Sequence, residues 1–141
     1  GKIPLDIKFH DEDLLILNKY KDNLDNIRSQ IDNQNINFYI DYIVNSLFKA
    51  NKYFNDQEPW KKKDNMLRLN TIVYTTLEIV RKISFLLYPI IPETSLKALN
   101  IFGIKEDKIK LNTIDNNEYL IKGNNLNKID ILFKKIEKNN D

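Results

Sequence analysis

The sequence predicts an all-α protein, an antiparallel bundle of about four helices followed by a mostly irregular C-terminal tail. Only 3 glycines and 4 prolines occur among 141 residues, and they lie outside the long segments with regular apolar spacing, which is typical of a helical protein. Within those segments the apolar residues recur with the period of an α-helix. The length and the 42% apolar content fit one domain with a real core. We therefore expect a single domain over residues 1–141.

The first expected elements are an extended lead-in over residues 1–10 and a helix over 11–32. The helix is expected to start at the acidic run 11–13, because negative charge stabilises a helix N-terminus. We interpret these acids as a solvent-exposed face that complements the helix dipole, and not as metal ligands. The Asn-rich stretch 33–35 marks the end of the helix.

Three further helices are expected over 36–55, 64–88 and 92–102, with Asp64 or Asn65 as the N-cap of the third. Their short connections make consecutive helices antiparallel neighbours. The apolar spacing predicts a set of mostly buried side chains: Leu17, Leu24, Ile40, Ile43, Leu47, Val73, Leu77, Val80 and Leu87.

The tail is expected to begin where the apolar pattern decays, after Gly103. The helices thus occupy 11–103, and residues 104–141 form a mostly irregular segment docked on the bundle. The side chains expected to dock it are Ile121, Ile131, Leu132 and Phe133.

Composition excludes several classes of function. The chain has no cysteine, one histidine and a net charge of only +2, so disulfides, thiolate zinc sites and a general nucleic-acid-coating surface are excluded. No phosphate loop or nucleophile elbow is present, and we assign no catalytic residue, metal or cofactor to the chain. His10 is expected to be exposed or to cap a helix. The apolar runs are too short to span a membrane, and the expected location is the cytoplasm.

The most informative feature is Trp60, the only tryptophan, which follows Pro59 and precedes Lys61, Lys62 and Lys63. Proline ends the preceding helix and stiffens the connection. A flat aromatic side chain on such a turn can stack on an unpaired base while ammonium groups meet its phosphates. A tryptophan that caps the core, beside a solvated corner of lysines, explains the same residues. The residues alone leave both interpretations open.

A resemblance to a known family covers nearly the whole chain. Residues 51–60 read Asn-Lys-Tyr-Phe, four further residues, then Pro-Trp, which resembles the helix end and turn of the anticodon-binding domain of methionyl-tRNA synthetases. Further likenesses follow in the order of the family, and they lie at 1–4, 68–69, 77–81, 86–94 and 131–136.

The resemblance implies a C-terminal fragment of an ATP-dependent methionine–tRNA ligase that reads the CAU anticodon of tRNA(Met). It implies that Trp60 stacks on an anticodon base, that Pro59 shapes the turn and that Asn51 lies on the helix approaching it. The chemistry would belong to the missing N-terminal catalytic domain, because the HIGH and KMSKS signatures are absent. The family's Asn-x-x-x-Arg anticodon-reading pair would lie before Gly1. The alternatives are the anticodon domain of another class I synthetase and a helical protein-interaction domain; a free-standing enzyme has almost no residue support.

Overall fold

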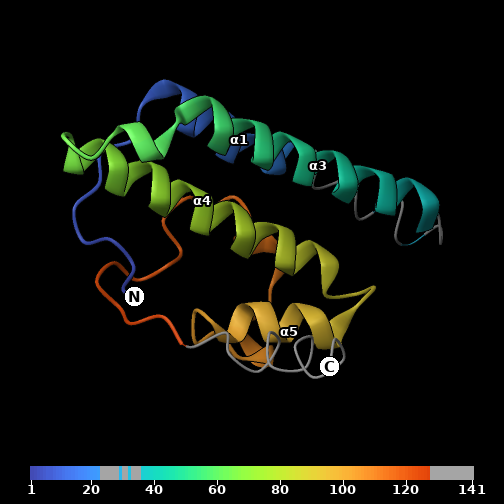
Figure 1. The fold of residues 1–141 in the computed structure, drawn as a ribbon. Helices are drawn as coiled ribbons and strands as arrows, with labels where there is room; N and C mark the ends of the chain where they lie inside the picture. The colour runs from blue at the N-terminus through green and yellow to red at the C-terminus, as the bar shows by residue number, and fades with distance from the viewer. Residues whose placement is uncertain (23–28, 30–31, 33–35, 128–141) are drawn as a thin grey trace, which may run out of the picture.

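The computed structural model describes residues 1–22, 29, 32 and 36–127. Within them lie the helices α1 (Asp11–Asp22), α3 (Ile36–Gln57), α4 (Met66–Leu87) and α5 (Pro92–Asn100). In Figure 1, α4 lies between the layer formed by α1 and α3 and the shorter α5, and it contacts all three. The predicted all-α class is confirmed for this part of the chain, and none of these helices is long and apolar enough to cross a membrane.

The helix boundaries lie close to the predicted ones. α3 continues two residues beyond the expected end, to Gln57, and α4 begins at Met66. Asn65 is its N-cap, because the side-chain oxygen accepts a hydrogen bond from the backbone N–H of Arg68 at 3.1 Å. The first helix is described to Asp22. Most of its expected continuation to residue 32 lies outside the described residues, and so does Leu24.

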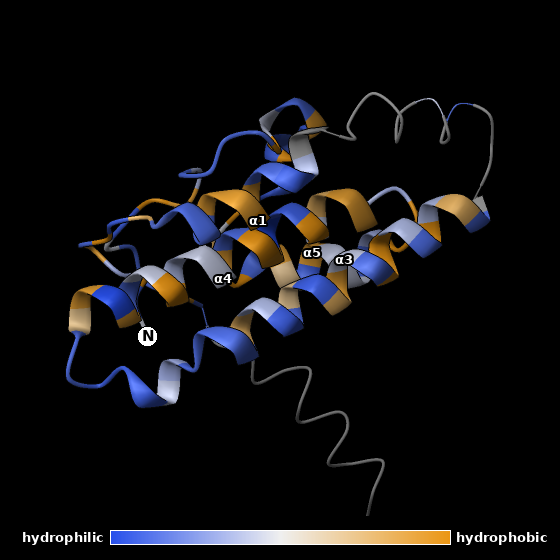
Figure 2. Cartoon of the chain, turned by 90° about the horizontal axis from the view of Figure 1, so that it is seen from above, coloured by the Kyte–Doolittle hydropathy of each residue, from blue (hydrophilic) through white to orange (hydrophobic). Residues whose placement is uncertain are grey.

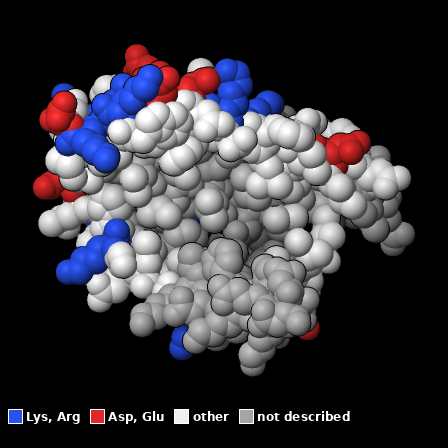
Figure 3. Space-filling model, in the orientation of Figure 1, with Lys and Arg blue, Asp and Glu red and all other residues white. Residues whose placement is uncertain are grey.

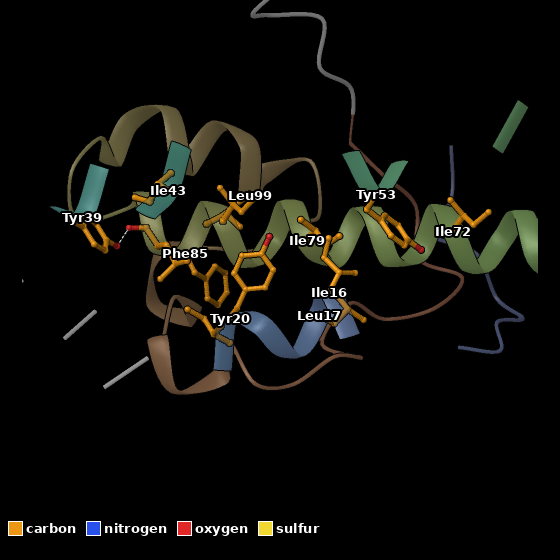
Figure 4. Close-up of a cluster of buried hydrophobic side chains, with 13 residues drawn as sticks. Ile16, Leu17, Tyr20, Tyr39, Ile43, Tyr53, Ile72, Ile79, Phe85 and Leu99 are labelled. Carbon is orange, nitrogen blue, oxygen red and sulfur yellow. Dashed lines mark hydrogen bonds between the residues drawn. The ribbon is translucent and has the colours of Figure 1, made fainter. Parts of the chain in front are cut away.

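The buried face of α3 is rotated from the predicted one. Ile43 is buried as predicted, but Ile40 and Leu47 are 41% and 48% exposed, so their predicted burial was wrong. Tyr39 occupies the core position next to Ile40 and donates a hydrogen bond to the carbonyl of Leu86 on α4 (Figure 4). A buried tyrosine needs such a partner for its hydroxyl. The spacing of apolar residues along α3 gives no information on a hydrogen-bond partner that lies on another helix.

One residue of the predicted apolar row of α4, Val80, was wrongly placed in the core. Figure 2 shows polar and apolar residues alternating along α4, which lies among the other helices. Other helices enclose α4, so some of its charged side chains are buried. A prediction based on the spacing of apolar residues places such side chains in solvent. Val80 is 39% exposed, whereas Leu17 on α1 is fully buried as predicted. The other three residues of the row, Val73, Leu77 and Leu87, are not exposed, and Leu77 and Leu87 pack against the buried core.

A buried ion pair on α4 attaches the tail to the bundle. Glu78 and Arg81 have no exposed surface, and Arg81 Nε lies 2.9 Å from Glu78 Oε2. The guanidinium also donates to the backbone oxygens of Thr113 at 3.0 Å and Asn116 at 2.5 Å. The Glu78 carboxylate accepts a hydrogen bond from the backbone N–H of Leu120 at 3.3 Å. The pair is thus satisfied largely by main-chain atoms of the tail.

Lys82 makes a second attachment beside this pair. Its ammonium donates to the carbonyl of Leu17 on α1 at 3.0 Å and to the side-chain oxygen of Asn117 at 2.5 Å. Lys82 is fully buried. One side chain of α4 therefore joins α1 and the tail.

The described tail is mostly irregular, as predicted, with short 3-10 turns η2 (Glu106–Lys108) and η3 (Leu111–Thr113). It docks through Ile114 and Leu120, which are buried, whereas the predicted docking residue Ile121 is 66% exposed. That prediction was wrong because Leu120, the neighbour of Ile121, points inward. The other residues of the prediction lie outside the described ones: Ile131, Leu132 and Phe133.

The lead-in pairs with the end of the described tail. The backbone N–H of Ile3 donates to Asn124 O, and that of Gly123 donates to Ile3 O, each at 2.8 Å. Ile3 is only 2% exposed. The two ends of the described chain therefore lie side by side below α4 (Figure 1).

Candidate nucleic-acid interface

The turn after α3 is fixed by Glu58 and Pro59. Glu58 adopts a left-handed backbone conformation with φ 48°, which ends the right-handed helix. The 3-10 turn η1 (Pro59–Lys61) follows, and the backbone N–H groups of Lys61 and Lys62 donate to Glu58 O at 2.9 Å and Pro59 O at 3.0 Å. Proline suits the first position of such a turn because its φ is preset and its missing donor costs nothing there. Pro59 is buried and anchors the turn.

Trp60 projects from this turn and is 52% exposed, as the base-stacking interpretation requires. Its ring packs on that of Phe54, with centroids 6.3 Å apart and planes inclined by 59°. The contact restrains the indole on one side. About half of its surface is open to solvent, which favours the base-stacking interpretation over a core residue.

The three lysines after Trp60 differ in their surroundings. Lys61 Nζ lies 3.3 Å from the Glu58 carboxylate, so part of its charge is compensated. Lys62 is half-buried and Lys63 is exposed, and neither has an ion pair with any described residue. Figure 3 shows basic side chains gathered over the end of the molecule where α3 leads into η1, mixed with acidic ones. The local charge is positive but modest.

Asn51 is not part of the turn. It lies exposed on α3, about 9 Å along the helix axis from Gln57 at 1.5 Å per residue. Among the described residues, no hydrogen bond joins it to Trp60. Of the predicted site residues, the structure brings Pro59, Trp60 and the three lysines together and leaves Asn51 on the approach.

A buried polar cluster, which the sequence analysis did not predict, lies next to the turn, at the end of α3. Arg68 on α4 holds Asp13 on α1 at 2.7 Å, and it also donates to Gln57 at the end of α3 at 2.6 Å. Tyr53 donates to the Asp13 carboxylate at 2.5 Å. This cluster of Asp13, Tyr53, Gln57 and Arg68 joins three helices where α3 meets η1.

Asp13 therefore corrects a prediction. It has no exposed surface, whereas the sequence assigned it to a solvated acidic face; Asp11 and Glu12 are exposed as expected. Burial alone raises the pKa of Asp13, but hydrogen bonds from Arg68 and Tyr53 lower it further than burial raises it, so the carboxyl has a pKa below its usual value. Asp13 is thus a buried carboxylate held by its partners.

The backbone of His10, at the start of α1, makes the hydrogen bonds of a helix cap. The backbone N–H of His10 donates to the Asp13 carboxylate at 2.8 Å, and the carbonyl of His10 accepts from Asp13 and Leu14, as in a helix cap. Within the described residues, no cluster of three or more histidine or acidic side chains could hold a metal.

Comparison with known proteins shows the family of the domain that carries this turn. A family model described as the anticodon binding domain of methionyl tRNA ligase matches residues 3–141. Methionine–tRNA ligases of Brucella suis biovar 1 and Mycobacterium leprae are 32% and 33% identical over 109 and 113 residues, which is 77% of this chain and 21% of each relative. The chain thus spans about a fifth of the length of these relatives.

Solved structures agree with this result. The apo form of Mycobacterium tuberculosis methionyl-tRNA synthetase matches 90% of this chain and 26% of its own, with a TM-score of 0.80 and 28% identity. A structure of that enzyme with bound methionyl-adenylate matches equally well.

Proposed function

We propose, from the premise that the chain belongs to the family of anticodon-binding domains of methionyl-tRNA ligase, that it binds the anticodon of tRNA(Met) at the turn carrying Trp60. The proposal includes a parent protein in which another domain attaches methionine to this tRNA with ATP, in the cytoplasm. Residues 1–141 act in it as one anticodon-binding unit.

The observation that carries the proposal is the position of Trp60. An indole that is half open to solvent, restrained by Phe54 and raised on a proline turn offers a preorganised face for one base. Lys62 and Lys63 have no carboxylate partner among the described residues and can meet the phosphates that flank such a base. Pro59 fixes the turn, and Asn51 lies on the path of the adjoining nucleotides.

The test is a titration with a labelled anticodon stem-loop of tRNA(Met). Trp60→Ala should weaken binding by about 1–3 kcal/mol, roughly 5- to 150-fold, and Trp60→Phe should retain part of the affinity. Ile121→Ala, which removes another exposed apolar side chain, in the tail, should bind like the unchanged protein.

Tryptophan fluorescence gives an independent readout, because Trp60 is the only tryptophan. Stacking on a base should quench it. Unchanged fluorescence at saturating RNA, together with unaltered affinity of Trp60→Ala, would contradict the proposal. A stem-loop with a different anticodon, bound as tightly, would contradict the specificity for tRNA(Met).

A further inference from the structure

A groove between α1 and α3 lies next to the end of α3 that leads into the Trp60 turn. Its volume is about 270 Å³. Its apolar lining includes Leu15 and Tyr53, and its polar lining includes Lys19, Lys49, Lys52 and Asp56. Nothing in the function proposed above uses it.

The charges in this groove do not balance. Lys52 is paired with Asp56 at 2.6 Å, whereas Lys19 on α1 and Lys49 on α3 have no carboxylate within 4.0 Å anywhere in the described part of the chain. Glu12, the other acid of the groove, lies 3.4 Å from Arg68. Lys19 and Lys49 line the groove from different helices, so the groove carries positive charge that an anion can compensate.

The groove extends toward the turn that carries Trp60, because its lining includes Gln57, two residues before Pro59. From Lys49 to Gln57 the helix rises about 12 Å at 1.5 Å per residue. A stacked strand covers this distance in three to four nucleotides at about 3.4 Å each. A strand with one base on Trp60 can therefore place a phosphate some three to four nucleotides further along at Lys49.

The lining fits a sugar–phosphate chain better than a free ion. Leu15 is 64% exposed and provides an apolar surface for ribose, while the lysines at the rim meet phosphates. A free anion would need fixed donors at one point, and this groove spreads its charges along its length.

We propose that the groove between Lys19 and Lys49 binds the RNA backbone that adjoins the base stacked on Trp60. This inference rests on the proposed function and extends its site from one turn to a track along α3. The occupant is the sugar–phosphate backbone of the same RNA, and the groove binds it independently of the base sequence.

The experiment compares Lys19→Gln/Lys49→Gln with Lys105→Gln/Lys108→Gln, which removes two exposed lysines around η2. Affinity for the labelled stem-loop is measured from 50 to 200 mM salt. The groove variant should lower the slope of log affinity against log salt by about 1.4, which corresponds to two single-strand contacts, and should bind about tenfold more weakly at 100 mM. The control should keep the original slope.

The outcomes separate the two proposals. If the groove variant matches its control while Trp60→Ala still weakens binding, the groove proposal is overturned and the proposed function stands. If Trp60→Ala is also without effect, both fail. If the groove variant keeps its RNA affinity but loses binding of an acidic peptide such as oligoglutamate, the groove belongs to a protein partner and the RNA assignment is wrong.

Discussion

Asp13 and Arg68 form a two-point ion pair between α1 and α4, with Nη1 to Oδ2 at 2.7 Å and Nη2 to Oδ1 at 3.0 Å. Asp13 is fully buried and only 8% of the Arg68 side chain is exposed. Planar, bidentate geometry makes such a pair specific as well as strong. The pair sets the relative position of two helices 55 residues apart in the chain.

Asp13→Asn should destabilise the protein by about 3 kcal/mol, because it leaves a buried guanidinium without its counter-charge. Denaturant unfolding measures this. Asp11→Asn, at an exposed position in the same acidic run, should change stability by less than about 0.5 kcal/mol. Equal losses of stability in the two variants would show that the buried ion pair does not contribute more to the free energy of unfolding than an exposed carboxylate.

The same pair predicts a pH dependence. The hydrogen bonds to Asp13 outweigh the effect of burial, so its pKa in the folded protein lies below the usual 3.8. A depressed carboxyl pKa contributes stability that is present above about pH 4 and is lost as the pH falls through the folded value. Below pH 4 the free energy of unfolding of the unchanged protein should fall more steeply than that of Asp13→Asn. Parallel curves would contradict this assignment.

Lys82 predicts a second rise of stability with pH, in the basic range. Burial, with a further contribution from Arg81, lowers the pKa of the Lys82 ammonium to about 8, against about 10.4 in the unfolded chain. Between these values the unfolded chain holds a proton that the folded protein lacks, so stability rises with pH, by at most about 1.4 kcal/mol per unit. Unfolding curves from pH 7.5 to 9.5 measure the slope. It should vanish in Lys82→Met, and a slope retained in that variant would assign it to another group.

Glu58 should restrain RNA binding through its ion pair with Lys61. Glu58→Gln preserves the length of the side chain and releases Lys61, so affinity for the stem-loop at low salt should rise about two- to fivefold, the size of an exposed ion pair. Glu93→Gln, on the exposed start of α5, is the matched control. Weaker binding by Glu58→Gln would place the Glu58 carboxylate in a direct contact with RNA.

Gly123 should tolerate alanine less well than Gly103. Both have positive φ, of 84° and 72°, a conformation that costs an L-residue about 1–2 kcal/mol. A Cβ at Gly123 would also approach Leu5 Cδ1 to 3.3 Å, whereas a Cβ at Gly103 would meet nothing within 4 Å. Gly123→Ala should therefore lose more stability and speed hydrogen exchange at the amide of Ile3, which donates to the carbonyl of Asn124 next to Gly123. Equal losses would show that Leu5 moves aside freely.

The features predicted well from sequence depend on neighbours along the chain. The end of α3 follows from Glu58-Pro59, and the cap at Asn65 follows from a local hydrogen bond. Such local features are determined by a few consecutive residues.

The features predicted wrongly depend on distant partners. The burial of Asp13 requires Arg68, and that of Tyr39 requires a carbonyl 47 residues away. Apolar spacing ranks residues by hydrophobicity alone and thus placed Ile40 in the core and a charged residue outside it. The groove of Lys19 and Lys49 was missed for the same reason, because it exists only when α1 lies beside α3.

The attachment of the tail to α4 has a consequence for sequence divergence. Arg81 donates to the backbone carbonyl oxygens of Thr113 and Asn116 in the tail, and every amino acid presents the same carbonyl. Mutations at these two positions can therefore alter the side chain without removing the acceptor, whereas the contact of Lys82 with the tail depends on the side chain of Asn117. Along a lineage, positions 113 and 116 can change in composition while Arg81 keeps this part of the tail in place.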